Sequence, residues 1–187
     1  MNTEPARDDG GGAADGEPGV AERPRRLGQL LTVGAVIFVL DLASKVLVVA
    51  TLSEQPPLKL LGGLIYLTEV RNTGAAFGLA QGMTVVFTLV AAGVIVVILR
   101  IAPRLRSAGW AWALGLVVGG ALGNLVDRIF RSPGVFRGGV VDFLSVLDPA
   151  GQVWPIFNVA DSAIVCGGLL GVVMAFRGRD FDGTRTH

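Results

Sequence analysis

The chain has 187 residues, of which 51% are hydrophobic and only 17% are charged, and its mean hydropathy is +0.60. This composition lies outside the range of ordinary soluble domains and indicates a membrane protein. A formal net charge of +1, without an arginine-rich arm, argues against nucleic-acid binding. With Cys166 and His187 as the single cysteine and histidine, an internal disulfide is excluded, and neither a Ser-His-Asp triad nor a zinc site is expected. Carboxylates are the remaining candidates for chemistry.

Four long apolar runs follow a polar amino-terminal segment. Residues 1–22 hold six acidic side chains and one arginine among Gly, Ala and Pro, and we expect a disordered cytoplasmic tail. The apolar runs lie at about 27–52, 83–101, 107–129 and 155–176. Each approaches the roughly 20 residues that a helix needs to cross a bilayer, and the first lacks a small-residue cleavage site.

The sequence therefore predicts an all-α membrane protein with a bundle of four transmembrane helices. A single membrane-embedded domain is expected over residues 23–179, with a cytoplasmic tail at 180–187. Arginines cluster before the first run, between the second and third, and after the fourth. By the positive-inside rule, both termini are expected in the cytoplasm, although the opposite loops also hold some basic residues.

The two loops on the other side carry turn signals. Gly62-Gly63 lies between the segments 57–61 and 64–70, which predicts a hairpin with a two-residue loop and hence a small extracytoplasmic β-sheet. The second loop, 131–154, contains several Gly and Pro turn signals and is interpreted as a connection that carries Asp142.

Polar side chains converge at one depth in the predicted bundle. At about 1.5 Å per residue, Asp41 lies about 21 Å along the first span, and Asp161 lies about 9 Å from Pro155, where the fourth is expected to begin. The polar residues of each span are three or four positions apart, so each set shares a helix face. These sets are Asp41 with Lys45, Asn124 with Asp127 and Arg128, and Asn158 with Asp161.

Two carboxylates held close together can hydrolyse a peptide bond without a metal or a cofactor. One stays protonated because two adjacent charges are costly, while the other activates water. Spacing allows either Asp142 or Asp127 to be the partner of Asp161. Asp41 and Lys45 fit a structural ion pair as well as they fit a supporting role.

Other interpretations fit less well. A proton-coupled channel or transporter needs polar groups through the full membrane depth, yet the second span is wholly apolar. A non-catalytic membrane scaffold predicts that conservative changes at Asp142 and Asp161 affect folding more than turnover. Cys166 is expected to be a packing residue, and Ser44 next to Lys45 does not suit a Ser/Lys hydrolase because adjacent helix residues point in different directions.

Five sequence blocks in order resemble the bacterial lipoprotein signal peptidases, also called type II signal peptidases, which are intramembrane aspartyl endopeptidases. The blocks are Leu40-Asp41-Leu42-Ala43-Ser44-Lys45, Arg71-Asn72-Thr73-Gly74-Ala75-Ala76-Phe77-Gly78, Gly119-Gly120-Ala121-Leu122-Gly123-Asn124-Leu125-Val126-Asp127-Arg128, Val140-Val141-Asp142-Phe143 and Phe157-Asn158-Val159-Ala160-Asp161-Ser162-Ala163. The resemblance extends from Leu40 to Gly167 and does not include the acidic tail.

The resemblance implies that Asp142 and Asp161 form the catalytic pair. It implies that a second set of residues supports the active site or contacts the lipid-modified substrate, and we give Asp127 a supporting role as well. That set is Asp41, Lys45, Asn72, Asn124, Arg128 and Asn158. The implied substrates are diacylglyceryl-modified prolipoproteins, cut on the amino side of the lipidated cysteine. The implied location is the bacterial cytoplasmic membrane, in contact with its lipids, with the active site near the extracytoplasmic face.

Overall fold

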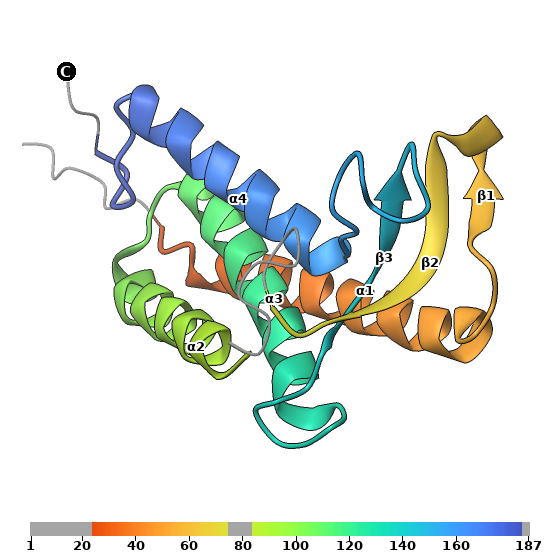
Figure 1. The fold of residues 1–187 in the computed structure, drawn as a ribbon. Helices are drawn as coiled ribbons and strands as arrows, with labels where there is room; N and C mark the ends of the chain where they lie inside the picture. The colour runs from red at the N-terminus through yellow and green to blue at the C-terminus, as the bar shows by residue number, and fades with distance from the viewer. Residues whose placement is uncertain (1–23, 75–83, 185–187) are drawn as a thin grey trace, which may run out of the picture.

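The computed structural model describes residues 24–74 and 84–184, which form four long helices and a three-stranded sheet (Figure 1). The helices are α1 (Leu27–Leu52), α2 (Thr84–Ile101), α3 (Ala108–Phe130) and α4 (Val159–Phe176). The strands are β1 (Leu58–Leu60), β2 (Ile65–Asn72) and β3 (Val140–Val146). Short 3₁₀ turns, η1 (Leu61–Gly63) and η3 (Ala102–Arg104), follow β1 and α2. The amino-terminal tail and the end of the block 71–78 lie outside the described residues.

All four described helices are long and apolar enough to cross a membrane, as predicted. Many of their large apolar side chains point away from the bundle, including Leu47, Leu89, Val97, Leu169 and Phe176. Such a surface suits contact with lipid acyl chains and would be costly to expose to water. The chain is a multi-pass membrane protein.

Helix α3 packs against each of the other three helices, with its most extensive contacts to α1 and α4. Small residues allow this close approach. A Cβ on Gly119 would lie 2.6 Å from the backbone oxygen of Gly34 in α1, and one on Gly120 would overlap the backbone oxygen of Ala160 in α4. Close backbone contact between small residues is a usual way for helices to associate in lipid, where the hydrophobic effect supplies little attraction.

The predicted sheet is present, but it differs from the expectation in two respects. Its strand order is β1-β2-β3 with antiparallel pairing throughout. The hairpin between β1 and β2 closes at the pair Leu60 and Ile65, so four residues form the loop and the predicted two-residue loop is wrong. Both Gly62 and Gly63 have positive φ, which explains why glycines are needed in this wider turn.

The second difference is β3, because residues 140–146 were expected to be part of a loop. This strand pairs with β2 through Val140, Val141 and Asp142, opposite Asn72, Arg71 and Val70. Its apolar side chains Val141 and Phe143 pack with Val48 of α1 in a small core beneath the sheet. Asp142 therefore lies on a buried strand, which is held by backbone pairing with β2 and by side-chain packing against α1.

The fourth span begins later than predicted. The helix starts at Val159, because Phe157 exchanges backbone hydrogen bonds with Leu144 of β3 and continues the sheet (Phe157 N–H to Leu144 O, 2.9 Å; Leu144 N–H to Phe157 O, 2.8 Å). Asn158 then caps the helix, with Asp161 as the reciprocal partner in a capping box. Asp161 consequently lies in the first turn of α4, where the prediction placed it about two turns inside a helix.

Candidate active site

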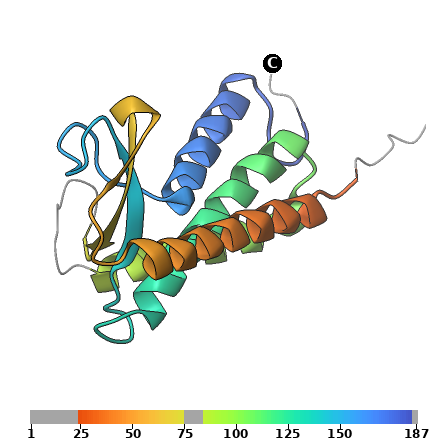
Figure 2. The ribbon, with the colours of Figure 1, turned by 90° about the vertical axis from the view of Figure 1, so that its right-hand side faces the viewer.

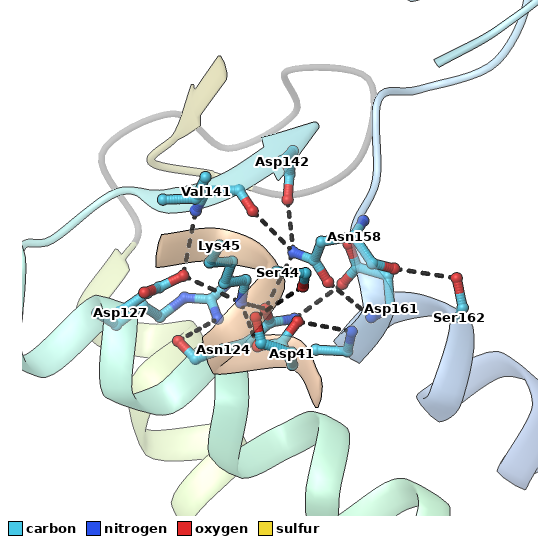
Figure 3. Close-up of polar contacts among 12 residues, drawn as sticks. Asp41, Ser44, Lys45, Asn124, Asp127, Val141, Asp142, Asn158, Asp161 and Ser162 are labelled. Carbon is cyan, nitrogen blue, oxygen red and sulfur yellow. Dashed lines mark hydrogen bonds and ion pairs between the residues drawn. The ribbon is translucent and has the colours of Figure 1, made fainter. Parts of the chain in front are cut away.

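Asp142 and Asp161 meet at Asn158, where β3 passes the amino-terminal end of α4 (Figure 3). The side-chain amide of Asn158 donates to Asp142 Oδ1 at 2.7 Å, and its backbone N–H donates to Asp161 Oδ2 at 3.1 Å. One residue thus holds both carboxylates, although they come from a strand and a helix.

Two further asparagines complete the hydrogen bonding of this pair. Asn72 Nδ2 donates to Asp142 Oδ2 at 2.9 Å, and Asn124 Nδ2 donates to Asp161 Oδ1 at 2.8 Å. Every oxygen of the two carboxylates therefore accepts at least one N–H bond. Donors to a carboxylate stabilise its charged form, so this arrangement can hold negative charge away from bulk water.

The orientation of each asparagine amide is set by what its oxygen accepts. Asn72 Oδ1 accepts the backbone N–H of Gly74, Asn158 Oδ1 accepts that of Asp161, and Asn124 Oδ1 accepts Lys45 Nζ, each at 2.9 Å. With the oxygens engaged in this way, the amide nitrogens must face the aspartates. The donors are thus positioned before any substrate binds.

Behind the pair lies a buried ion network centred on Lys45. Its Nζ is 2.7 Å from Asp41 Oδ2 and 3.0 Å from Asp127 Oδ2, and the side chains of all three residues are at most 1% exposed. Asp41 Oδ1 accepts the backbone N–H of Ala160 at 2.9 Å. Because Ala160 directly precedes Asp161, the charge pair on α1 also fixes the first turn of α4.

Asp127 fixes strand β3 in a similar way. Its Oδ2 accepts the backbone N–H of Val141 at 3.2 Å, and its Oδ1 accepts from Arg131 Nε. Val141 directly precedes Asp142, so Asp127 fixes the segment that carries this carboxylate. Both oxygens of Asp127 are occupied in this way, and the residue does not line the cavity described next. The geometry favours Asp142 over Asp127 as the partner of Asp161.

A cavity of about 750 Å³ opens beside the two aspartates. Its polar wall contains Asn72, Asn124, Arg128, Asp142, Asp161 and Ser162. The rest of the wall is largely apolar and comes from α2, α3, α4 and the segment before α4, and includes Phe87, Val90, Val94, Ala121, Val165, Cys166 and Trp154. The cavity can therefore hold a molecule with a polar reacting group and a long apolar part.

Arg128 stands at the boundary between these two walls. Its guanidinium lies 5.9 Å from the centre of the Phe87 ring and donates to the backbone oxygen of Asn124 at 3.3 Å. It interacts electrostatically with both Asp161 and Asp142. Arg128 thus places a positive charge near the two carboxylates.

The pKa of Asp142 is raised from 3.8 to about 7, mainly because the carboxyl is buried and secondly because of the negative charge of Asp161. The hydrogen bond from Asn72, the charge of Lys45 and the hydrogen bond from Asn158 act in the opposite direction but do not compensate. Near neutral pH, Asp142 can therefore be either a proton donor or an acceptor.

The structure brings every site residue predicted from the sequence into one connected region. Four contributors were not predicted, namely the side chains of Arg131 and Ser162 and the backbone N–H groups of Ala160 and Val141. Arg131 follows Asp127 by four residues, and this spacing could have identified it. The backbone donors leave no signal in a sequence. Among the described residues, there is no group of three or more His, Cys, Asp or Glu that could hold a metal ion.

Residues 33–177 match the family model described as signal peptidase (SPase) II, which covers more than half of the chain. The chain belongs to the signal peptidase II family. It is 53% identical over 178 residues to the lipoprotein signal peptidase of Streptomyces griseus subsp. griseus, covering 95% of this chain and 88% of that protein. It is 49% identical over 175 residues to the lipoprotein signal peptidase of Mycobacterium tuberculosis H37Rv, covering 94% of this chain and 83% of that protein.

The fold of this signal peptidase II family member is also similar to solved structures. Two bacterial membrane enzyme structures, obtained by the in meso method at 2.3 and 1.9 Å, each superpose with a TM-score of 0.70 at 24% and 23% identity. The superpositions cover 83% of this chain and 92% and 97% of the other chains. The family resemblance drawn from the five sequence blocks is confirmed, and family membership makes the chain a protease.

Proposed function

We propose that this protein is an aspartyl endopeptidase of the membrane, and that Asp142 and Asp161 are its catalytic residues. It removes signal peptides from diacylglyceryl-modified prolipoproteins by cutting on the amino side of the lipidated cysteine. The observation that carries this proposal is the pair of carboxylates joined through Asn158 at the polar end of a largely apolar cavity. Relatives that are about half identical to this chain are lipoprotein signal peptidases, which supports prolipoproteins as the substrates.

The charges of the site support a pair that shares one proton. The network contains four carboxylates, those of Asp41, Asp127, Asp142 and Asp161, and three cations, those of Lys45, Arg128 and Arg131. With all groups ionised it would carry one excess negative charge in a poorly solvated place. A single proton on Asp142 or Asp161 removes this excess, and an aspartyl protease needs that state.

In the proposed reaction, the ionised aspartate takes a proton from water while the water oxygen attacks the scissile carbonyl carbon. The protonated aspartate donates a hydrogen bond to the carbonyl oxygen and then its proton, which gives a neutral tetrahedral diol. The carbon–nitrogen bond then breaks, the leaving amine receives the proton that came from water, and the other aspartate recovers its own from a diol hydroxyl. Arg128, next to the cavity, favours the transient negative charge.

The shape of the cavity supports a lipid-anchored substrate. Acyl chains and the apolar core of a signal peptide can contact the apolar walls, while the bond to be cut lies at the polar end. Binding of these remote parts supplies free energy that positions the reacting bond. The arginine-rich helix ends lie away from the sheet. By the positive-inside rule, this arrangement supports a location of the sheet and the aspartates near the extracytoplasmic face of the cytoplasmic membrane.

Cleavage of a purified precursor by Asp142→Asn and Asp161→Asn variants tests this proposal. We expect each variant to keep the thermal stability of a folded protein and to lose turnover by at least about a thousandfold, since neither can complete the proton exchange. Asp148→Asn changes a carboxylate that follows β3 and does not line the cavity, and this matched control should keep full activity.

Two further arms of the experiment separate this mechanism from others. A precursor without diacylglycerol should be cut poorly, and a chelator should not inhibit. Normal turnover by either Asn variant would disprove the aspartyl pair, and loss of folding without a specific loss of turnover would support a structural role for these residues.

A further inference from the structure

One end of the helix bundle carries a concentration of arginines, which we call the basal rim. It comprises Arg25, Arg26, Arg100, Arg104, Arg106, Arg177 and Arg179. These residues come from the start of α1, the connection between α2 and α3, and the segment after α4. In Figures 1 and 2, these segments lie together at the end of the bundle opposite the sheet.

Backbone contacts hold the three segments of the basal rim in place. The N–H of Arg26 donates to the oxygen of Leu105 at 2.8 Å, which joins α1 to the connection between α2 and α3. The oxygen of Phe181 accepts the N–H of Arg106 at 2.9 Å, and Trp110 Nε1 donates to the oxygen of Arg179 at 2.6 Å. The chain after α4 thus folds back beneath the bundle, and the arginines are displayed on a fixed frame.

The charge of the rim is not balanced by the described residues around it. Asp180 and Asp182 are the acidic residues described at this end, against seven arginines. At the sheet end, the charged residues outside the buried network balance one another, since Glu54, Glu69 and Asp148 accompany Lys59, Arg71 and Arg137. Five arginines of the rim are exposed, namely Arg25, Arg100, Arg104, Arg177 and Arg179.

Arg26 adds an observation of a different kind. Its Nε is buried and has no hydrogen-bond partner in the structure. A donor that lacks an acceptor is unfavourable, so an acceptor supplied from outside the chain would be favoured near this side chain. A guanidinium matches the geometry of phosphate oxygens particularly well.

We propose that the basal rim binds the headgroups of anionic phospholipids in the leaflet at this end of the bundle. The rim lies where the ends of membrane-spanning helices meet the headgroup layer, and arginines near an anionic surface are each attracted to it. Arg26 is partly exposed, so its guanidinium can meet a headgroup phosphodiester at a position where the chain itself gives Nε no acceptor. This interaction is independent of the protease activity proposed above and does not depend on which leaflet the rim faces.

The test measures lipid retention and thermal stability of the full chain in nanodiscs of phosphatidylcholine alone or mixed with phosphatidylglycerol. We expect the wild-type protein to retain phosphatidylglycerol selectively in native mass spectrometry and to melt at a higher temperature in the mixed discs. The Arg100→Gln/Arg104→Gln variant should lose roughly fivefold in apparent affinity for each arginine removed. Lys59→Gln/Arg137→Gln, which removes two exposed charges at the sheet end, is the matched control and should retain the wild-type preference.

Three results would overturn the inference. One is equal retention and equal melting in the two lipid mixtures, and another is an equal loss of preference in the variant and its control. The third concerns the six acidic residues at positions 1–22, which could compete for the rim. If a preference for phosphatidylglycerol appeared only after these six residues were changed to their amides, the ligand of the rim in the wild-type protein would be the chain's own amino-terminal segment and not a lipid.

Discussion

Asn158 illustrates how much of the site depends on single side chains. It caps the amino-terminal end of α4, donates to Asp142 through its amide and donates to Asp161 through its backbone. Asn72 and Asn124 each add one donor, with an orientation fixed by a backbone N–H or by Lys45. Amides suit this task because they stay neutral and offer donor and acceptor at once, so they position two carboxylates without neutralising either.

The raised pKa of Asp142 gives a prediction at the same scale. We expect kcat/KM to be high below pH of about 7 and to decrease above it, because Asp142 then loses its proton and both carboxylates are charged. Stability should follow the same group. Between pH 3.8 and about 7 the folded state keeps a proton that the unfolded state has lost, so the stability contributed by Asp142 falls as pH rises through this window and then levels off.

Rate profiles of the wild-type protein and thermal unfolding in detergent check both parts. The Asp142→Asn variant cannot ionise at this position, so its melting temperature should vary less with pH in that window than the melting temperature of the wild type. The raised pKa of Asp142 would be contradicted if kcat/KM of the wild type decreased only far above neutral pH. It would also be contradicted if the melting temperature of the variant varied with pH as much as that of the wild type.

Lys45 is the second residue with a sharp expectation. Changing Lys45→Met leaves Asp41 and Asp127 buried without their shared cation, and we expect a loss of about 3–5 kcal/mol in unfolding free energy. Lys59→Met removes an exposed lysine and should change the melting temperature little. Similar melting temperatures for the two variants would show that the Lys45 network contributes nothing specific to the stability of the fold.

At the scale of elements, the site depends on where α4 and β3 approach α3. Asp41 holds the first turn of α4 through Ala160, and Asp127 holds β3 through Val141. These two anchors act on the residues immediately before Asp161 and Asp142. A small displacement of either element would therefore change the separation of the two catalytic candidates.

Gly120 gives a direct way to displace α4. An added Cβ at this position would overlap the backbone oxygen of Ala160 and approach Ile164 Cγ1 at 2.8 Å, so Gly120→Ala must push α4 away. We expect a loss of about 1–3 kcal/mol in stability together with a marked decrease in kcat. Gly168→Ala, on a face of α4 where no atom lies within 4 Å, should be neutral or slightly stabilising.

Both glycine variants are compared by thermal unfolding and by turnover of the lipidated precursor. If Gly120→Ala kept wild-type turnover, close packing of α3 on α4 would not be needed for the geometry of the aspartates.

At the scale of the whole molecule, the bundle has two unlike ends. The sheet and the first turn of α4, which carry the two aspartates, lie toward one end, and the segments of the basal rim lie at the other (Figures 1 and 2). The cavity joins the polar site to apolar walls of α2, α3 and α4. This polarity suits an enzyme that receives a substrate already embedded in the same bilayer.

We propose that both termini lie in the cytoplasm, because a chain that crosses the membrane four times returns to the side on which it started. Single cysteines at Gln152 and Asp182, introduced into a Cys166→Ser background, report the two faces in intact cells. A membrane-impermeant maleimide should label the cysteine at position 152, near the sheet, and should reach the one at position 182 only after lysis. The reverse pattern would contradict the proposed orientation and with it the extracytoplasmic site.

The sequence predicted the parts of this protein that depend on local pattern. Long apolar runs identified the four spans, because a helix must satisfy its own backbone within lipid and needs a minimum length to cross it. The blocks around Asp41, Asn124, Asp142 and Asp161 identified the family. The Asn158-x-x-Asp161 spacing is a capping signature that would have placed the start of α4 correctly, but it was interpreted as one face of a longer helix.

The tertiary structure decided how those parts meet. Asn72 reaches Asp142 across 70 positions, and the N–H of Ala160 reaches Asp41 across 119, and no local pattern specifies such pairs. Spacing alone allowed either Asp127 or Asp142 to be the partner of Asp161. In the folded chain, the carboxylate of Asp127 contacts Lys45, Arg131 and the backbone N–H of Val141 in β3. The physical reason is that helix length and amphipathic character arise within a segment, whereas β3 forms and the carboxylates come together only when distant segments supply one another's hydrogen-bond partners.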